Sequence, residues 1–273
     1  MGREIITSRQ NPLVKYVCGL ALKKKRSEEG LFRFAGIKLL CEALSSDVKI
    51  KYIVYKEPAD ERVLELISEA LANEKISEES LVAVNEAVFD KISEEKAPEG
   101  VVTVAHMPAI HGVYEKASVE REDRVLIAES LRDPGNLGTV IRSCYALGID
   151  TLILTDDCAD LYNQKTARAA MGALFRLKTL SVPCTSLPSV IGELREQGRR
   201  VFATALSDRS LDIGEITLER GDCFVIGNEG HGLSDSTVSA CTSSVIIPMR
   251  EDAESLNAAA AAAICIWETV RAR

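Results

Sequence analysis

The stretch "RVLIAESLRDPGNLGTVIRSCYALGIDTLILTD", residues 124–156, decides how this chain folds. It begins and ends with short, continuously apolar runs, which is how strands read when both faces of their sheet are covered. Between them, Asp-Pro-Gly at 133–135 predicts a tight turn, Asn136 suits the N-cap of a helix, and Gly148 suits its end. A strand, a helix and a second strand in this order predict parallel strands with a helical crossover.

The remainder of the chain repeats this alternation. The runs "VFATAL", "CFVIGNEG" and "SVIIPM" predict buried strands, and "QKTARAAMGAL" and "SVIGELREQGRR" predict helices. We therefore expect residues 123–273 to form an α/β domain with a parallel sheet flanked by helices. Ligands of such sheets bind beyond the carboxyl ends of the strands, where the sequence places "ESLRDPGN", "TALSD", "GNEGHG" and "PMREDAESLN".

The segment "SLNAAAAAAICIWE", residues 255–268, predicts a helix from about Leu256 to Val270. Alanine is the best helix former, and Ser255 or Asn257 is a suitable N-cap. Side chains this small let other backbone approach closely, and the helix N-terminus offers free N–H groups with a partial positive charge. A buried, capped helix without a chemical role is the alternative for this segment taken alone.

The first part of the chain predicts a smaller α/β unit. Helical spacing runs from Lys15 to Leu44, interrupted by the basic turn and by "LFRFAG". The runs "IKYIVYK", "LVAVN" and "GVVTVAHM" predict strands, and "ERVLELISEALAN" predicts an amphipathic helix. We assign residues 1–106 to this domain. Residues 107–122 have no clear period and contain Pro and Gly, so we expect a linker there.

Charge is unevenly distributed along the chain. The net charge is −8, which by itself disfavours a nucleic-acid partner, but residues 1–38 contain nine Lys or Arg against three Asp or Glu. "KKKRS", at residues 23–27, is the centre of this basic end and suits phosphate binding, although a solvated loop is the alternative. If the partner is RNA, the expected contacts are Arg9, Lys23, Lys24, Lys25, Arg26 and Arg168.

Other patterns exclude several classes of protein. The eight cysteines form no C-x-x-C pair, and the three histidines form no zinc motif, so we expect no metal site. Free thiols suit a reducing cytoplasm. The N-terminus lacks the apolar core of a secretory signal, and the longest apolar run is about half a membrane span, so we expect no membrane association. No G-x-G-x-x-G follows the first strand of the α/β domain, which disfavours an ordinary dinucleotide site.

Two segments of the α/β domain are candidates for chemistry. Arg142 lies one helical turn after Gly138, which leaves space above the arginine. "FVIGNEGHGLS", residues 224–234, can fold its backbone amides around a ligand because it is rich in glycine. The alternatives are close helix packing at Gly138 and a surface turn that carries Glu229.

These segments together resemble the SpoU, or TrmH-like, RNA 2′-O-ribose methyltransferases of the SPOUT superfamily. The resemblance rests on the N-x-G-x-x-x-R helix, the "IGNEGHGLS" loop and the "IPM…SLN…AAA" terminus, in that order and at similar spacing over residues 124–270. "YNQKTARAAMGALFRL" is similar to the intervening helix of the family. Residues 1–106, with "SRQNPLVKYVCGL" and "FRFAGIKLLCEAL", resemble the substrate-binding domain that often precedes the catalytic one.

The resemblance implies a C-terminal trefoil knot, a homodimer formed by the catalytic domain, and S-adenosylmethionine as the methyl donor. A true knot is exceptional among protein folds. Six alanines suit a helix that lies tightly against a knotted backbone and a partner subunit. The chain departs from the family in one place: Ala258-Ala259 stand where Val-Ser is usual, so any role of that hydroxyl is in doubt.

The resemblance also implies roles for individual residues. Arg142 would activate the ribose hydroxyl; because a guanidinium stays protonated, we expect it to hold an RNA phosphate and stabilise the developing alkoxide. Glu229 would accept the proton, or orient Arg142 and Asn136. The expected catalytic residues are Asn136, Arg142, Glu229, Ser255 and Asn257. The expected cofactor-binding residues are Thr204, Gly227, Asn228, Gly230, Ile247, Met249 and Leu256.

The sequence therefore predicts methyl transfer from S-adenosylmethionine to a ribose 2′-hydroxyl in structured RNA. Ribosomal RNA is favoured over transfer RNA because the separate N-terminal domain resembles the ribosomal branch. One alternative is an RNA-binding or ribosome-assembly protein with an inactive knot domain. Another is a nucleotide-dependent oxidoreductase, which the missing glycine fingerprint disfavours.

Overall fold

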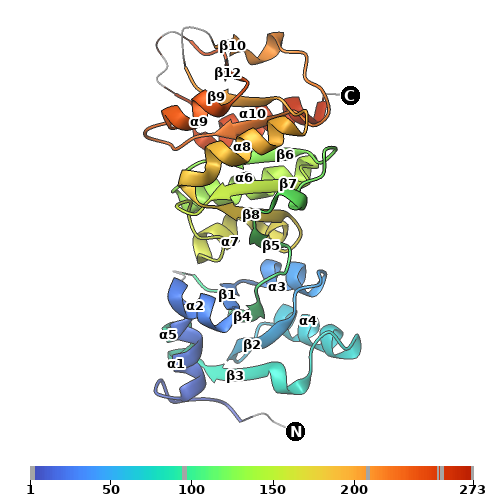
Figure 1. Cartoon of the computed structure of the whole chain (residues 1–273). Helices are drawn as coiled ribbons and strands as arrows, with labels where there is room; N and C mark the ends of the chain where they lie inside the picture. Colours follow the sequence, from blue (N-terminus) through green and yellow to red (C-terminus); the bar gives the residue numbers. More distant parts are fainter. Residues whose placement is uncertain (1–3, 94–96, 207–209, 251, 253–254, 272–273) are drawn as a thin grey trace. The chain divides into compact units, whose positions relative to one another are not determined.

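The computed structural model describes residues 4–93, 97–206, 210–250, 252 and 255–271. Contacts divide the chain into two units (Figure 1). The first unit comprises Met1–Pro108 and Tyr162–Phe175, and the second comprises Ala109–Leu161 and Arg176–Arg273. Within the described ranges, no helix is long and apolar enough to cross a membrane.

The first unit is built on a four-stranded sheet with the order β1-β4-β2-β3, in which only β2 and β3 are parallel. Its strands are β1 (Leu31–Ala35), β2 (Ile50–Glu57), β3 (Leu81–Asn85) and β4 (Val101–His106). Its helices include α1 (Pro12–Gly19), α2 (Lys23–Glu29), α3 (Ile37–Leu44), α4 (Glu61–Ala72), α5 (Glu86–Ile92) and the short η1 (Glu78–Ser80). Helices α1 and α5 contribute to one apolar cluster and α3 and α4 to another, so both faces of the sheet are covered.

A segment from the middle of the chain also belongs to this unit. It contains α7 (Gln164–Ala170) and η3 (Met171–Phe175). The ring of Tyr162 lies 4.8 Å from that of Phe32, and the ring of Phe175 lies 5.3 Å from that of Phe34, centroid to centroid. The predicted domain of residues 123–273 therefore does not coincide with a compact unit, because these aromatic contacts join the segment to β1.

The second unit contains an eight-stranded sheet with the order β10-β12-β9-β11-β6-β7-β8-β5, and every pair of neighbours is parallel. Its strands are β5 (His111–Val113), β6 (Val125–Ala128), β7 (Thr151–Thr155), β8 (Lys178–Val182), β9 (Val201–Thr204), β10 (Leu211–Asp212), β11 (Cys223–Ile226) and β12 (Ser243–Ile246). The predicted parallel α/β fold is confirmed. The predicted linker, however, contains β5, which pairs with β8 and is too short to show a period in the sequence.

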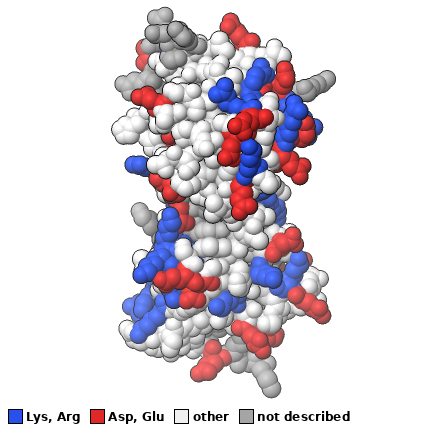
Figure 2. Space-filling view, viewed as in Figure 1, with Lys and Arg blue, Asp and Glu red and all other residues white. Residues whose placement is uncertain are grey.

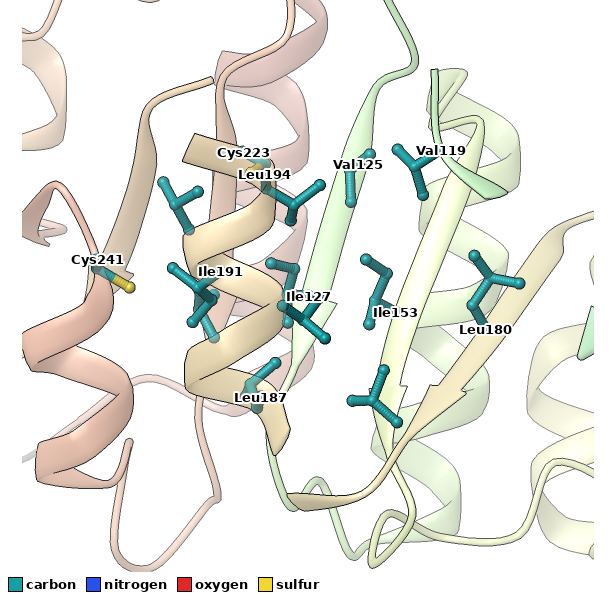
Figure 3. Packing of buried hydrophobic residues seen from close by; sticks show 14 of the residues in the cluster. Val119, Val125, Ile127, Ile153, Leu180, Leu187, Ile191, Leu194, Cys223 and Cys241 are labelled. Carbon is teal, nitrogen blue, oxygen red and sulfur yellow. The ribbon is translucent and has the colours of Figure 1, made fainter. Parts of the chain in front are cut away.

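Helices cover this sheet on both faces. They are α6 (Pro134–Leu147), α8 (Leu187–Glu196), α9 (Asp235–Ala240) and α10 (Ala258–Arg271), with the short η2 (Lys116–Ser118), η4 (Cys184–Ser186) and η5 (Ile213–Glu215). On one face, Leu187, Ile191 and Leu194 of α8 pack against Ile127 and Ile153 of the sheet (Figure 3). Because side chains alternate along a strand, each strand also presents side chains to the opposite face of the sheet. On that face, α10 packs against α6 and β11.

Helix α6 begins differently from the prediction. Its N-cap is Asp133, whose Oδ1 accepts the N–H of Asn136 at 2.8 Å, rather than Asn136 itself. Pro134 occupies the first helical position, where the lack of a backbone N–H costs the helix no hydrogen bond. The side chain of Asn136 is therefore free to make other contacts. Gly148 ends the helix in the left-handed conformation, with φ of 84°, as the sequence predicts.

Helix α10 is capped by Asn257. Its Oδ1 accepts the N–H groups of Ala259 at 2.9 Å and Ala260 at 3.3 Å, so Asn257 rather than Ser255 is the N-cap. The helix begins at Ala258, close to the predicted start. Residues 251, 253 and 254, which precede it, lie outside the described residues, and the trefoil knot stays a prediction.

Candidate active site

The candidate site lies at the carboxyl edge of four neighbouring strands. The sheet order places β12, β9, β11 and β6 side by side. Because all four are parallel, the segments that follow them meet at one edge, as the sequence predicts. These segments are residues 129–133 after β6, 205–206 after β9, 227–234 after β11 and 247–257 after β12, of which 251, 253 and 254 are outside the described residues.

The loop after β11 closes tightly on itself. Asn228 and Gly232 exchange backbone hydrogen bonds of 2.9 and 3.0 Å. A Cβ added to Gly227 would lie only 2.4 Å from the carbonyl carbon of Gly232 and 2.7 Å from the backbone N of Leu233. Gly232 itself has φ of +68°, where glycine is favoured. Glycine is therefore required at both positions, Gly227 and Gly232, for the loop to adopt this conformation.

The side chain of Asn228 supports this loop from inside. Its Oδ1 accepts the N–H of Gly230 at 2.8 Å, and its Nδ2 donates to the carbonyl of Ser130 at 2.7 Å. We predicted Asn228 as a cofactor-binding residue, but its amide oxygen and nitrogen already have these partners. A half-buried amide has to satisfy its donors and acceptors, and here it does so within the protein. Asn228 therefore contributes to a ligand site by holding the backbone of the loop after β11 in place.

Three of the predicted catalytic side chains form a chain of hydrogen bonds. The Nδ2 of Asn136 donates to Oε1 of Glu229 at 3.0 Å, and the Oδ1 of Asn136 accepts from Nδ2 of Asn257 at 3.0 Å. The three residues come from α6, from the loop after β11 and from the start of α10. Asn136 thereby has its donor fixed toward the carboxylate and its acceptor fixed toward Asn257.

Glu229 lies where several donors converge. Besides Asn136, the backbone N–H groups of Arg132 and Asp133 donate to its carboxylate at 3.4 and 3.3 Å, close to the N-terminus of α6. Burial raises the pKa of Glu229, but these hydrogen bonds to the charged form outweigh burial and bring the pKa below its usual value. The carboxylate is therefore ionised at neutral pH.

Arg142 stands apart from this chain of hydrogen bonds. It lies six residues after Asn136, about 9 Å further along the axis of α6, and its side chain is exposed. Among the described residues, none forms a hydrogen bond or ion pair with its guanidinium. The expected contact in which Glu229 orients Arg142 is not present.

The remaining predicted residues are arranged around the same edge. Thr204 donates its hydroxyl to the carbonyl of Val225 at 2.8 Å, so that group stabilises the sheet instead of facing a ligand. Ser255 is exposed. Ile247 directly follows β12 and is half-buried, whereas Met249 and Leu256 are 46% and 39% exposed. These exposed apolar side chains can provide a wall for a ligand with apolar parts.

The predicted RNA contacts at residues 23–26 lie on a helix, α2, and not on a loop. Lys24 and Lys25 each face a glutamate one turn later, Glu28 at 3.9 Å and Glu29 at 2.5 Å. The prediction for Arg26 is wrong. Its side chain is buried, and Nη1 donates to the carbonyls of two residues that precede the helix, at 2.9 and 2.6 Å. A run of like charges does not reveal which member faces the core.

The other predicted RNA contacts are exposed. Lys23 and Lys24 face solvent on α2, and Arg168 is exposed on α7. Arg9 is exposed while its Nε donates to the carbonyl of Ala87 at 2.8 Å. In the first unit, Lys and Arg side chains gather over α1 and α2, with acidic side chains among them (Figure 2). This surface is mixed in charge, not uniformly basic.

Glu129, which follows β6 directly, is a site residue that the sequence patterns did not predict. Its side chain is 3% exposed, and its two carboxylate oxygens accept the hydroxyl of Ser234 at 2.7 Å and the backbone N–H of Ser234 at 3.2 Å. Glu129 thus attaches the end of the glycine-rich loop to the end of β6. The sequence feature that could have identified Glu129 is a carboxylate directly after a predicted buried strand. Across the described ranges, no group of three His, Cys, Asp or Glu could hold a metal ion.

Comparisons with known proteins agree with this arrangement. The model of the SpoU rRNA Methylase family matches residues 123–267, and that of the MRM3-like substrate binding domain matches residues 11–103. The chain is 32% identical over 262 residues to the 23S rRNA (guanosine(2553)-2′-O)-methyltransferase RlmP of Bacillus subtilis, covering 96% of this chain and 97% of that protein. It is 29% identical to the 23S rRNA (uridine(2479)-2′-O)-methyltransferase of Streptomyces viridochromogenes, covering 98% and 92%.

Solved structures of methyltransferases are also similar to this chain. The AdoMet-bound rRNA methyltransferase of Sinorhizobium meliloti superposes with a TM-score of 0.82 at 30% identity, covering 98% of this chain and 97% of that one. The SpoU methyltransferase AviRb of Streptomyces viridochromogenes, in complex with AdoMet, superposes with a TM-score of 0.79 at 26% identity, covering 96% and 98%. Both likenesses extend over the two units of the chain.

Proposed function

The chain belongs to the SpoU rRNA Methylase family and is an RNA 2′-O-methyltransferase, and we propose that its reaction takes place at the carboxyl edge of β6, β9, β11 and β12. The observation that carries this placement is the chain of hydrogen bonds through Glu229, Asn136 and Asn257, which joins three distant segments at that edge. An assembly protein with an idle site would have no need of this geometry.

The residues present fit S-adenosylmethionine, which supplies an electrophilic methyl group on a sulfonium. The loop from Gly227 to Gly232 brings its backbone close together, as a site for adenine and ribose requires. Met249 and Leu256 offer exposed apolar surface beside it, and Ile247 contributes backbone at the end of β12. The structures of relatives bound to AdoMet support the same methyl donor.

We assign to Arg142 the contact with the nucleophile, which is the 2′-oxygen of the ribose. A ribose hydroxyl is a poor nucleophile until its proton is shared or lost. A guanidinium stays protonated and cannot act as a base, so Arg142 stabilises the developing negative charge on the 2′-oxygen while the hydroxyl proton passes to solvent water. Its exposed position, without a partner among the described residues, leaves it available for this contact.

Glu229 has a positioning role in this proposal. A carboxylate whose pKa lies below its usual value is a weak base, so Glu229 is poorly suited to remove a proton from a hydroxyl. Its charge instead fixes the amide of Asn136, which in turn fixes Asn257. Each asparagine uses one of its two Nδ2 hydrogens in this chain of hydrogen bonds, so the other can donate to the ribose or to the carboxylate of the methyl donor, together with Ser255.

Ribosomal RNA is the proposed substrate. The relatives from Bacillus subtilis and Streptomyces viridochromogenes are named for 2′-O-methylation of 23S rRNA. The first part of this chain matches a substrate-binding domain over residues 11–103, in which Lys23 and Lys24 are exposed candidate contacts. Arg168 on α7, outside the matched residues, is a third exposed candidate. An rRNA substrate agrees with activity in the cytoplasm.

Titration calorimetry and a transfer assay test this function. We expect S-adenosylmethionine to bind and NADH not to bind. We also expect the protein to transfer a tritiated methyl group to in vitro transcribed 23S rRNA. Binding of S-adenosylmethionine without transfer to 23S, 16S or tRNA transcripts would favour the RNA-binding alternative. Binding of NADH alone would favour an oxidoreductase.

We also propose a homodimer formed by the second unit, with the C-terminal segment knotted. Helices α6 and α10 pack on each other, and Tyr145 and Trp267 leave 46% and 54% of their surface exposed on them. Large exposed aromatic side chains on packed helices are typical of an interface. We expect sedimentation velocity at micromolar concentration to give the mass of a dimer. A monomer under these conditions would contradict this part of the proposal.

Asn257 provides a test that separates capping from function. Asn257→Ala removes the cap of α10 and should cost about 1 kcal/mol of stability. Asn257→Asp retains a capping oxygen and suits a helix N-terminus, but it replaces the donor that faces Oδ1 of Asn136 with an acceptor. We expect the Asp variant to melt like the wild type and to lose most methyl transfer. An Asp variant that is both stable and fully active would show that Asn257 is only a cap.

A further inference from the structure

Ser130 adopts a backbone conformation that is unusual for its residue type. It directly follows β6 and has φ of +54°, in the left-handed region. An L-residue with a side chain is strained there, whereas glycine is not. What serine adds over glycine is its hydroxyl, which donates to Oδ2 of Asp157 at 2.6 Å. The strained residue therefore retains a side chain whose hydroxyl bonds to a carboxylate.

Asp157 is held from two sides by hydroxyl groups. Ser130 donates to one oxygen, and Oγ1 of Thr155 donates to the other at 2.7 Å. Thr155 is in turn fixed, because its Oγ1 accepts the backbone N–H of Ser130 at 2.7 Å. Burial raises the pKa of Asp157, but the hydrogen bonds from these hydroxyls and from Arg132 outweigh it, so the pKa lies below its usual value. The carboxylate is ionised and fixed in place.

Asp157 in turn fixes Arg132. Its Oδ2 lies 3.3 Å from Nη2 of Arg132, whose side chain is 68% exposed. The backbone N–H of Arg132 points at Glu229, so this residue lies at the candidate active site. Apart from Asp157, no residue in the described part of the chain binds its guanidinium. An exposed ion pair contributes little to stability, so stability does not explain why a strained serine supports it.

The charges around Arg132 point to the class of its partner. Asp156, Asp157 and Glu229 all lie near this end of β6 and β7, so Arg132 presents a cation at an otherwise acidic rim. RNA has to bring phosphates to this rim to place a ribose at the site. The planar fork of arginine binds phosphate through two parallel hydrogen bonds, and one side of this fork is held by Asp157.

We propose that Arg132 binds an RNA phosphate beside the target ribose, and that Ser130 and Asp157 are positioning residues that hold its guanidinium for this contact. This inference rests on the proposed function, since it requires RNA at the carboxyl edge of the sheet. It adds a substrate contact that the sequence motifs do not contain.

Steady-state methyl transfer to transcribed 23S rRNA tests this inference. Arg132→Ala should raise KM for RNA about tenfold and make the slope of log KM against log[KCl] shallower by about 0.7 to 0.9, as expected for one lost phosphate contact. The affinity for S-adenosylmethionine should stay within about twofold, because no cofactor-binding residue is changed. Arg132→Lys keeps the charge and loses the fork, so its KM should lie between those of the wild type and the alanine variant.

Ser130→Gly separates positioning from a structural role. It removes the hydroxyl and relieves the strained backbone, so the melting temperature should be unchanged or higher. KM for RNA should nevertheless rise about threefold, because Asp157 and Arg132 lose their support. In the double variant with Arg132→Ala, Ser130→Gly should add nothing further. A merely structural serine would leave KM unchanged or lower stability.

Arg220→Ala is the matched control. Its Nε lies 3.3 Å from Oε2 of Glu122, and its side chain is 59% exposed, but it precedes β11 at the opposite, amino edge of the sheet. We expect KM for RNA to remain that of the wild type. An equal rise in KM for Arg132→Ala and Arg220→Ala would overturn the inference, as would a wild-type KM in Arg132→Ala or in Ser130→Gly.

The wild-type protein distinguishes failure of this inference from failure of the proposed function. If the wild type methylates a 16S or tRNA transcript instead of 23S rRNA, the same variants are compared on that transcript. A wild type that methylates none of the three overturns the proposed function, and this inference with it. A wild type that is active, with variants that match it, overturns this inference alone.

Discussion

Arg142→Ala is expected to lower methyl transfer by about 100- to 1,000-fold, the usual cost of removing one group that stabilises developing charge. Affinity for S-adenosylmethionine should stay within about threefold, because Arg142 lies apart from the loops that we assign to the methyl donor. Single-turnover transfer to 23S rRNA and titration calorimetry on the same preparation measure the two effects separately.

The structure also indicates that this variant should fold normally. The side chain of Arg142 is exposed, and no described residue depends on it for a hydrogen bond or ion pair. Its melting temperature should therefore match that of the wild type, and Arg220→Ala serves again as a control for loss of an exposed arginine. Turnover near the wild-type rate in Arg142→Ala would show that the assigned mechanism is wrong.

Gly227→Ala is expected to weaken S-adenosylmethionine binding by a factor of at least about 30, because the added Cβ would meet fixed backbone and not a flexible side chain. That Cβ would lie 2.4 Å from the carbonyl carbon of Gly232, so the loop after β11 has to open. Titration calorimetry measures the loss, and a thermal melt shows whether the sheet remains folded.

Gly192→Ala is the control for this substitution. Gly192 lies on α8, and an added Cβ would meet nothing within 4 Å, so we expect wild-type binding. If Gly227→Ala binds S-adenosylmethionine as tightly as the wild type, the loop after β11 does not hold the methyl donor.

The main elements of the second unit could be predicted because their sequence patterns are strong. "VLIA" and "TLILT" are continuously apolar and became β6 and β7, and Gly148 ends α6 as expected. Strands β5 and β10 have only three and two residues, so they show no period that a sequence can reveal. In the first unit, "LFRFA" interrupted a helical pattern and proved to be β1, because its residues are buried by packing that the local pattern does not contain.

The candidate site was predictable where topology determines it. Parallel strands end at one edge, so the meeting of Asn136, Glu229 and Asn257 follows from the order of strands and loops. The roles of individual side chains depend on details that residue types do not specify. Arg26 faces the core because of its position on α2, and Asn228 supports its own loop. Ser130 drew no attention because its left-handed backbone conformation cannot be read from the sequence.

Mapping of 2′-O-methyl nucleotides in ribosomal RNA is the decisive test of whether this protein methylates rRNA. We compare RNA from a strain that lacks this protein with RNA from the same strain carrying the wild type or Arg142→Ala. We expect that one ribose methylation disappears in the deletion strain, returns with the wild type and stays absent with Arg142→Ala. A deletion strain that retains every 2′-O-methyl group of its ribosomal RNA would show that the protein does not methylate rRNA.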